Sequence, residues 1–185
     1  LPISTATNLT GIIVGNGTTI AAGRTITGTA DEITVTNAGG NNDLWTFTPA
    51  DDKPIALMGF RIGQISEVAD AAEEGIDLTI VHLGATVSAG TGGSAVTPVP
   101  GDPAISDLAS GFTARINDTA VATSSGTTTV MEAIPWNNRN TPFEVWYPDL
   151  DYAPKCRQAS ALAIRMNTTI ADDMTFSGCA FVMEF

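Results

Sequence analysis

Alternating apolar and polar positions dominate the second half of the chain and predict β-strands. In ALAIRM, residues 161–166, the apolar Leu162, Ile164 and Met166 fall on one face, and Phe176 and Val182 share a face in the closing segment. An alternation with a period of two places every second side chain on the same side of a sheet. Strands are expected over residues 44–48, 55–65, 76–83, 113–116, 127–134, 142–146, 159–166 and 174–185.

Turn-rich segments such as PADDKP, TSSGT and PWNNRNTP separate these runs. About eight antiparallel strands with long connections suit an all-β fold, a two-sheet sandwich of jelly-roll type. The only helix candidate is SEVADAAEE, residues 66–74, where Ser66 could act as the N-cap. Because that segment is short, a helical turn and a loop stay open as alternatives.

Residues 1–42 differ from the rest, since they contain no aromatic residue and are rich in Thr, Gly, Asn and Ala. Their short β-branched runs, such as Ile12, Ile13 and Val14, bring too little bulk to close a core alone. We therefore expect an extended N-terminal arm or small β-element over 1–42 and a sandwich domain over 43–185. The arm would gain order by pairing with the main body or with a neighbouring subunit, which makes Ile12–Val14 candidate interface residues.

Hydrophobic residues make up 43% of the chain and charged residues 15%, which favours a sizeable core. The net charge of −12 argues against nucleic-acid binding, because that binding depends on neutralising phosphates with Lys and Arg. No run approaches the roughly 18 apolar residues of a membrane span. No signal peptide is visible at Leu1, and no membrane association is expected.

Candidate catalytic residues are few, so an enzyme is the least supported class. His82 is the only histidine, and no GxSxG elbow accompanies it. Chance alone brings some carboxylates together in a chain with 20 acidic residues, so no glycosidase pair is assigned among Glu132, Glu144, Asp149 and Asp151. With so few Cys and His ligands and no calcium-loop spacing, neither a metal nor a cofactor is expected.

Two further groups of residues leave alternatives open. Cys156 and Cys179 are either independent thiols or one disulfide. Trp136 is expected in the turn PWNNRN, and Trp146 and Tyr147 precede a proline, so we expect these three rings at element ends. They are candidate subunit contacts, with core packing and ligand stacking as the alternatives.

The segment FRIGQISEVADAAEEGIDLTIVHLGATVSAGTGGSAVTPVP and the ending ADDMTFSGCAFVMEF resemble small virion proteins of tailed bacteriophages. This resemblance covers residues 55–185 and implies a capsid decoration, or cement, protein without catalytic residues. The implied partner is the major capsid protein, the implied assembly is a homotrimer, and the implied location is the outer surface of the head. A carbohydrate-binding or host-adhesion module of a fibre or tail is an alternative function. A bacterial surface or pilus-like subunit with a Cys156–Cys179 disulfide is another.

Overall fold

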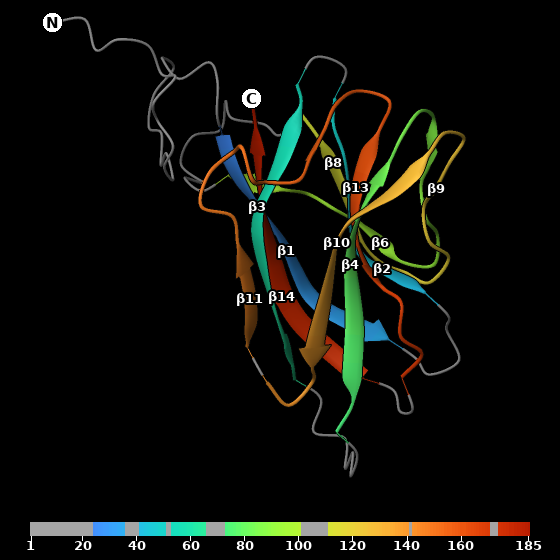
Figure 1. The fold of residues 1–185 in the computed structure, drawn as a ribbon, viewed down its shortest axis with the longest axis vertical. Helices are drawn as coiled ribbons and strands as arrows, with labels where there is room; N and C mark the ends of the chain where they lie inside the picture. The colour runs from blue at the N-terminus through green and yellow to red at the C-terminus, as the bar shows by residue number, and fades with distance from the viewer. Residues whose placement is uncertain are drawn as a thin grey trace, which may run out of the picture.

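The structure is a computed structural model that describes residues 24–35, 41–50, 53–65, 73–100, 111–140, 142–170 and 174–185. These residues form fourteen strands and contain no helix (Figure 1). The strands are β1 (Arg24–Val35), β2 (Asn42–Thr48), β3 (Ile55–Gln64), β4 (Gly75–Leu83), β5 (Val87–Ser88), β6 (Ser94–Val96), β7 (Val99–Pro100), β8 (Thr113–Asp118), β9 (Thr123–Ser124), β10 (Thr128–Asn137), β11 (Phe143–Trp146), β12 (Lys155–Cys156), β13 (Ala161–Met166) and β14 (Met174–Glu184).

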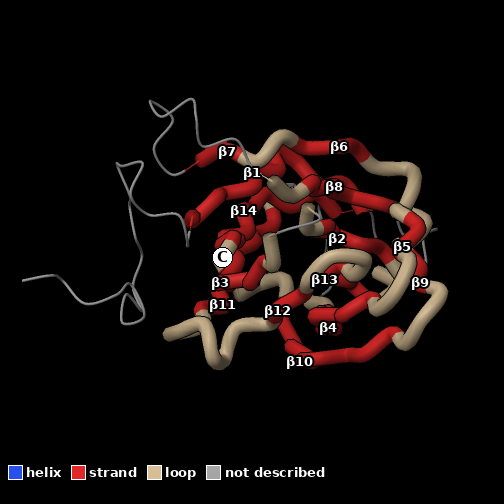
Figure 2. Tube along the Cα trace, turned by 90° about the horizontal axis from the view of Figure 1, so that it is seen from above, coloured by secondary structure: helices blue, strands red, loops and turns tan. Residues whose placement is uncertain are grey.

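The strands form two antiparallel sheets that face each other, as the view from above in Figure 2 shows. Sheet A has the order β11-β3-β14-β1-β7, with β12 also paired to β3. Sheet B has the order β10-β4-β13-β2-β8-β6. A separate two-stranded sheet joins β5 to β9. The prediction of an all-β, antiparallel fold is therefore confirmed.

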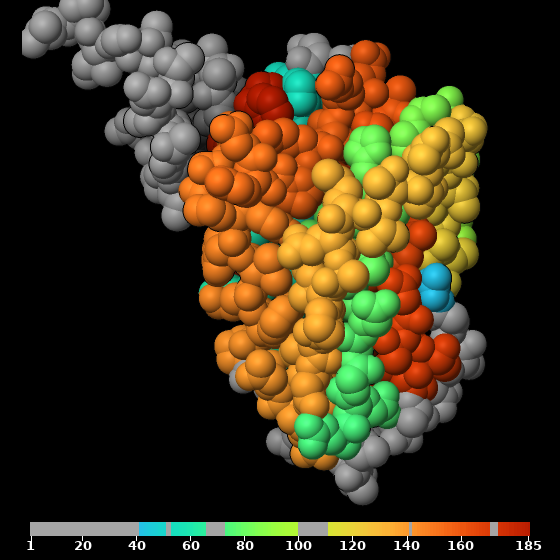
Figure 3. Space-filling model, viewed as in Figure 1, coloured from blue at the N-terminus to red at the C-terminus, as the bar shows by residue number. Residues whose placement is uncertain are grey.

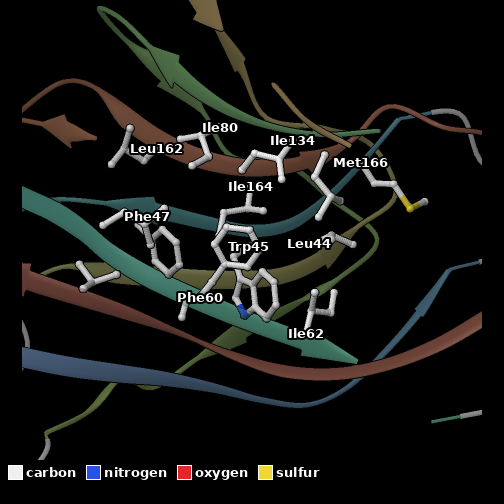
Figure 4. Close-up of a cluster of buried hydrophobic side chains, with 14 of the residues drawn as sticks. Leu44, Trp45, Phe47, Phe60, Ile62, Ile80, Ile134, Leu162, Ile164 and Met166 are labelled. Atoms are coloured by element: carbon white, nitrogen blue, oxygen red, sulfur yellow. The ribbon is translucent and has the colours of Figure 1, made fainter. Parts of the chain in front are cut away.

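Apolar side chains from the facing sides of the two sheets fill the space between them (Figure 4). Trp45 of β2 in sheet B meets Phe60 of β3 in sheet A, with ring centroids 6.3 Å apart. Leu162 and Ile164 reach this core from β13, as the alternation in ALAIRM predicts. Burying each such side chain contributes about 1.5–3 kcal/mol, so this layer is the main source of stability.

Each of the eight expected strand ranges contains a strand, but the first strand of sheet A lies outside them. β1 falls within the expected arm, and it pairs with β14 from Arg24 to Val35 with one irregularity between Ala30 and Ile33. Residues 24–35 therefore order by pairing with the main body. Most of the helix candidate at 66–74 lies outside the described residues.

The two-stranded sheet lies against the outer face of sheet B. Its β5 and β9 belong to residues 84–93 and 119–127, which we call the β5–β9 lobe (Figure 1, right). A small second core joins the lobe to sheet B: Val87 and Ala122 of the lobe pack with Val81, Leu83 and Ala161. The lobe is thus a third layer over one end of the sandwich.

Candidate functional site

An aromatic row crosses the outer face of sheet A. The strand register places Trp146 of β11 beside Gly59 of β3, and Gly59 beside Phe181 of β14. Since Gly59 has no side chain, the two rings lean over it and lie 4.6 Å apart between centroids, at 32°. A Cβ at Gly59 would lie 2.7 Å from the indole Cε3 and 2.5 Å from the carbonyl oxygen of Val145. The missing side chain is therefore what lets the indole lie close to the sheet.

A charged row lies next to the aromatic row on the same face. Glu144, Arg61 and Cys179 are neighbours across β11, β3 and β14. The Arg61 Nε donates to the Cys179 Sγ at 3.2 Å, and the guanidinium carbon lies 6.0 Å from the centroid of the Phe181 ring. The Trp146 Nε1 donates to a Glu144 carboxylate oxygen at 3.2 Å. The hydrogen bond to Cys179 and the attraction of Cys179 and Glu144 raise the pKa of Arg61, which stays charged.

We call Trp146, Phe181, Arg61 and Glu144 the aromatic platform. Its indole is 49% exposed, whereas Trp45 and Trp136 are 1% and 4% exposed and belong to the core. Hydrogen bonds to neighbouring strand residues hold both charged groups, Arg61 through Cys179 and Glu144 through the Trp146 indole. A half-exposed ring with one cation and one anion beside it is suited to binding a ligand. The described residues of this site include no nucleophile–base pair.

A second exposed apolar group lies on sheet B, along its edge strand β10. Val130 and Met131 are 57% and 45% exposed, and the pairing with β4 shifts register between Val130 and Glu132. A bulge of this kind bends an edge strand and turns consecutive side chains outward. This edge therefore offers apolar contact area on the other sheet from the aromatic platform.

Two buried aspartates fasten the β5–β9 lobe. The Asp43 carboxylate accepts hydrogen bonds from Arg165 Nε at 2.6 Å and from the Ala122 backbone N–H at 2.7 Å. Arg165 Nη2 also donates to the Ala122 carbonyl at 2.9 Å. The Asp43 side chain is 0% exposed. This charged pair therefore holds both backbone groups of Ala122, in the second segment of the lobe.

The same arrangement recurs at the first segment of the lobe. Asp118 accepts from Arg115 Nη2 at 2.6 Å and from the Gly93 N–H at 3.2 Å, while Arg115 Nη2 contacts the Gly93 carbonyl at 3.4 Å. Asp118 is the cross-strand partner of Asp43 in sheet B. The hydrogen bond to Asp118 raises the pKa of Arg115. Two neighbouring Asp–Arg pairs thus anchor the two halves of the lobe.

The lobe belongs to two stretches of sequence, 83–101 and 119–131, that contain no charged residue. In Figure 3 parts of these stretches lie together at the upper right of the molecule, in green and yellow. Most of their described side chains are exposed. A chain with a net charge of −12 therefore presents one surface region without charge.

The candidate interface residues fall in different environments. Trp146 is exposed and central to the aromatic platform. Trp136 stacks on Phe143 at 5.8 Å in the core and donates to the Asn140 carbonyl at 2.8 Å, so its ring is not on the surface. Tyr147 is partly buried against the core. Ile12, Ile13 and Val14 lie outside the described residues.

Tyr147 and three of the four candidate carboxylates, those of Glu132, Glu144 and Asp149, have local partners. The Tyr147 hydroxyl donates to Glu132, and burial, followed by this hydrogen bond, raises the pKa of Tyr147. Asp149 accepts from the backbone N–H of Asp151 at 2.8 Å, a turn contact. Glu144 belongs to the aromatic platform. None of these contacts brings two of the four carboxylates together.

Both cysteines are free and buried. Cys156 lies in the core, where burial raises the pKa of its thiol to about 12. Hydrogen bonds with Ser160 and with the backbone of Leu162 lower this pKa, but by less than burial raises it. Cys179 faces the opposite side of sheet A, beside Arg61. The two thiols are therefore independent in the fold, and the disulfide expected for a pilus-like subunit is absent.

Among the described residues, no group of three or more His, Cys, Asp or Glu side chains could hold a metal ion. No helix in the described part of the chain is long and apolar enough to cross a bilayer. Comparisons with protein-family models, with curated proteins and with solved structures found no match for this chain.

Sequence reasoning missed most of the aromatic platform and both Asp–Arg pairs. Phe181 and Arg61 lie far apart in sequence and meet only through the register of β3 with β14. Two signals were available: Gly59 interrupts an apolar strand run, and Asp43 and Asp118 lie at or next to strand ends, with Arg115 three residues before Asp118. A glycine inside a strand marks a close approach, which is its role here.

Proposed function

We propose that this chain is a structural virion protein: a capsid decoration protein with a jelly-roll sandwich that stabilises a phage head by bridging capsomers. In this proposal it acts as a homotrimer on the outer surface of the head, and its partner is the major capsid protein. It works by covering surface and not by transforming a substrate. The proposal combines the sequence resemblance with the arrangement of the exposed side chains.

The strand order supports the jelly-roll part of the proposal. With β8 and the shorter strands β5, β6, β7, β9 and β12 left aside, eight strands remain and are divided between the two sheets. In chain order they are β1, β2, β3, β4, β10, β11, β13 and β14. The first, eighth, third and sixth are neighbours in sheet A, and the second, seventh, fourth and fifth are neighbours in sheet B. A jelly roll, the fold of many viral capsid and lectin domains, has this order of two Greek keys.

One observation carries the bridging role: large exposed apolar side chains lie on two separate parts of the body. Val99 is on the β7 edge of sheet A, and Val130 and Met131 are on the β10 edge of sheet B. A protein that clamps neighbouring subunits needs contact surfaces on more than one side. Contacts of standard size bury roughly 1,600 Å², and several acting together multiply their hold.

Copy number in purified particles tests the function. Particles are isolated from the source of the gene on a density gradient, and quantitative mass spectrometry gives the ratio of this chain to the shell protein. A decoration protein is expected at hundreds of copies per particle. A handful of copies would indicate a tail or fibre component, and absence from the particles would refute a virion role.

A truncation tests the contribution of the arm. Removing residues 1–42 would also remove β1, which lies between β14 and β7 in sheet A, so the folded body would be damaged. Removing residues 1–23 leaves β1 in place and deletes Ile12, Ile13 and Val14. If the arm attaches the protein to the shell, this shorter chain folds but no longer co-sediments with stripped particles. Full binding would refute a role for the arm.

A further inference from the structure

We propose that the aromatic platform on the outer face of sheet A is a binding site for a neutral saccharide. In this site the exposed face of the Trp146 indole stacks against the apolar face of a pyranose ring, and Arg61 and Glu144 bind hydroxyl groups at its edge. The inference goes beyond the proposed role on the capsid and stands independently of it.

The indole is already in place before any ligand arrives. Phe181 lies 4.6 Å away on one side, Gly59 leaves room beneath the ring, and Glu144 accepts from the indole N–H. These contacts fix both side-chain torsions of Trp146 while half of its surface stays open to solvent. Little conformational entropy is then lost on binding, which is what a weak, flat ligand such as a sugar requires.

The polar groups beside the ring match hydroxyl groups. The Arg61 Nε is taken by Cys179, and none of the hydrogen bonds found among the described residues involves its two terminal nitrogens. Those nitrogens form a planar fork that can donate to two adjacent oxygens. Glu144 uses one carboxylate oxygen for the indole N–H and keeps acceptor capacity on the other. The two terminal nitrogens of Arg61 as donors and the second carboxylate oxygen of Glu144 as acceptor together suit a pair of adjacent sugar hydroxyl groups.

Charge distinguishes a neutral sugar from an anionic ligand. Arg61 and Glu144 are direct cross-strand neighbours and sum to zero charge, so the platform has no net attraction for an anion. The chain as a whole carries −12, which repels phosphorylated or carboxylated ligands at longer range. A saccharide without charge has no such penalty.

The surroundings also favour a small ligand over a protein. A protein-binding hot spot is expected to lie inside a ring of further contacts that exclude water. Here the aromatic row is bordered by the charged row, with Arg61 and Glu144 both exposed. Val130 and Met131, an exposed apolar pair, lie on sheet B. The aromatic row therefore has a polar border on the side of the charged row, which suits a ligand that carries hydroxyl groups.

A glycan array tests the proposal with the full chain. The biotinylated protein is displayed on streptavidin, because several copies raise the apparent affinity of weak sites. The array contains neutral, sialylated and sulfated glycans. Binding is expected to a subset of the neutral glycans. No binding to any glycan, or binding confined to the charged ones, would overturn the proposal.

Fluorescence titration with lactose, N-acetyllactosamine, maltotriose and chitotriose then locates the site. Trp45 and Trp136 are buried, so only Trp146 is accessible to acrylamide. At least one of these sugars should protect Trp146 from quenching. If none of the four sugars changes the quenching of Trp146, the assignment is contradicted. It is also contradicted if a sugar that protects Trp146 binds the W146A variant with unchanged affinity.

Matched variants separate the site from the fold. W146A is expected to lower the affinity about tenfold by removing the stacking surface. R61K keeps the charge but loses the two-pronged donor, so it should weaken binding severalfold, and E144Q provides a third variant should W146A fail to fold. Y152A removes a ring that is 72% exposed and outside both rows, so it serves as the control. Equal losses in Y152A and W146A would refute a specific site.

Discussion

Replacing Asp43 by asparagine should release the β5–β9 lobe from sheet B. The Asp43 carboxylate is fully buried and accepts from Arg165 Nε, from Arg165 Nη2 at 3.2 Å, and from the Ala122 N–H. Asparagine has the same shape but no charge, and its amide group puts donors where one acceptor oxygen was. In the variant Arg165 keeps its positive charge but loses its anionic partner.

The cost follows from the burial of the pair. Removing one partner from a buried ion pair destabilises a protein by about 3–5 kcal/mol, because the other charge is left without compensation. The Arg165 side chain is only 11% exposed, so water replaces little of the lost contact. Arg165 retains its hydrogen bond to the Ala122 carbonyl, which places the expected loss near the lower end, at about 3 kcal/mol.

Urea unfolding measures the total loss, and hydrogen exchange read by mass spectrometry locates it. D43N should lose protection first in peptides over 84–93 and 119–127, with smaller changes in β3 and β14. D151N is the matched control, because it removes the same charge from an exposed side chain. Surface substitutions usually change the free energy of unfolding by less than about 0.5 kcal/mol. If the free energies of unfolding of D43N and D151N differ by no more than this, the anchoring role of Asp43 is refuted.

Three other residues give further predictions. G59A should destabilise the chain by about 1–3 kcal/mol and increase the acrylamide quenching of Trp146, because the added Cβ would meet that ring; unchanged quenching would contradict the contact. An unfolded tyrosine ionises at a pH of about 10, whereas the raised pKa of Tyr147 keeps it protonated in the folded state above that pH. The melting temperature should therefore fall as the pH rises past about 10, and it should fall less steeply in Y147F. Cys156, with a pKa of about 12, should resist iodoacetamide at a pH of about 8 until urea unfolds the chain; rapid labelling of the folded protein would show that this thiol is not buried.

The strands could be predicted from the sequence because each is a local pattern. In β13 the alternation of Leu162, Ile164 and Met166 is set by burial on one side of a sheet, and that side became the core. β1 was harder, since its Thr-rich sequence RTITGTADEITV has little apolar bulk. It pairs with β14 along nearly its whole length, and the sequence of β1 alone does not specify that partner.

Trp136 illustrates a different limit. Its place after Pro135 and before Asn137 suggests a turn, whereas β10 extends through Asn137 and directs the ring into the core. The ring contacts Phe176 at 5.5 Å between centroids, a residue from the other sheet. A local turn signal was overridden by contacts that form only when the two sheets come together.

The aromatic platform depends on a strand register that the sequence does not encode locally. Trp146, Gly59 and Phe181 come from β11, β3 and β14, and a shift of one residue in either pairing would send alternate side chains to the opposite face. The register is held from the other side of sheet A, where Phe60 and Val182 are packed in the core. The outer face therefore inherits its arrangement from the inner one, so core substitutions at Phe60 should disturb the platform even though that side chain never reaches the surface.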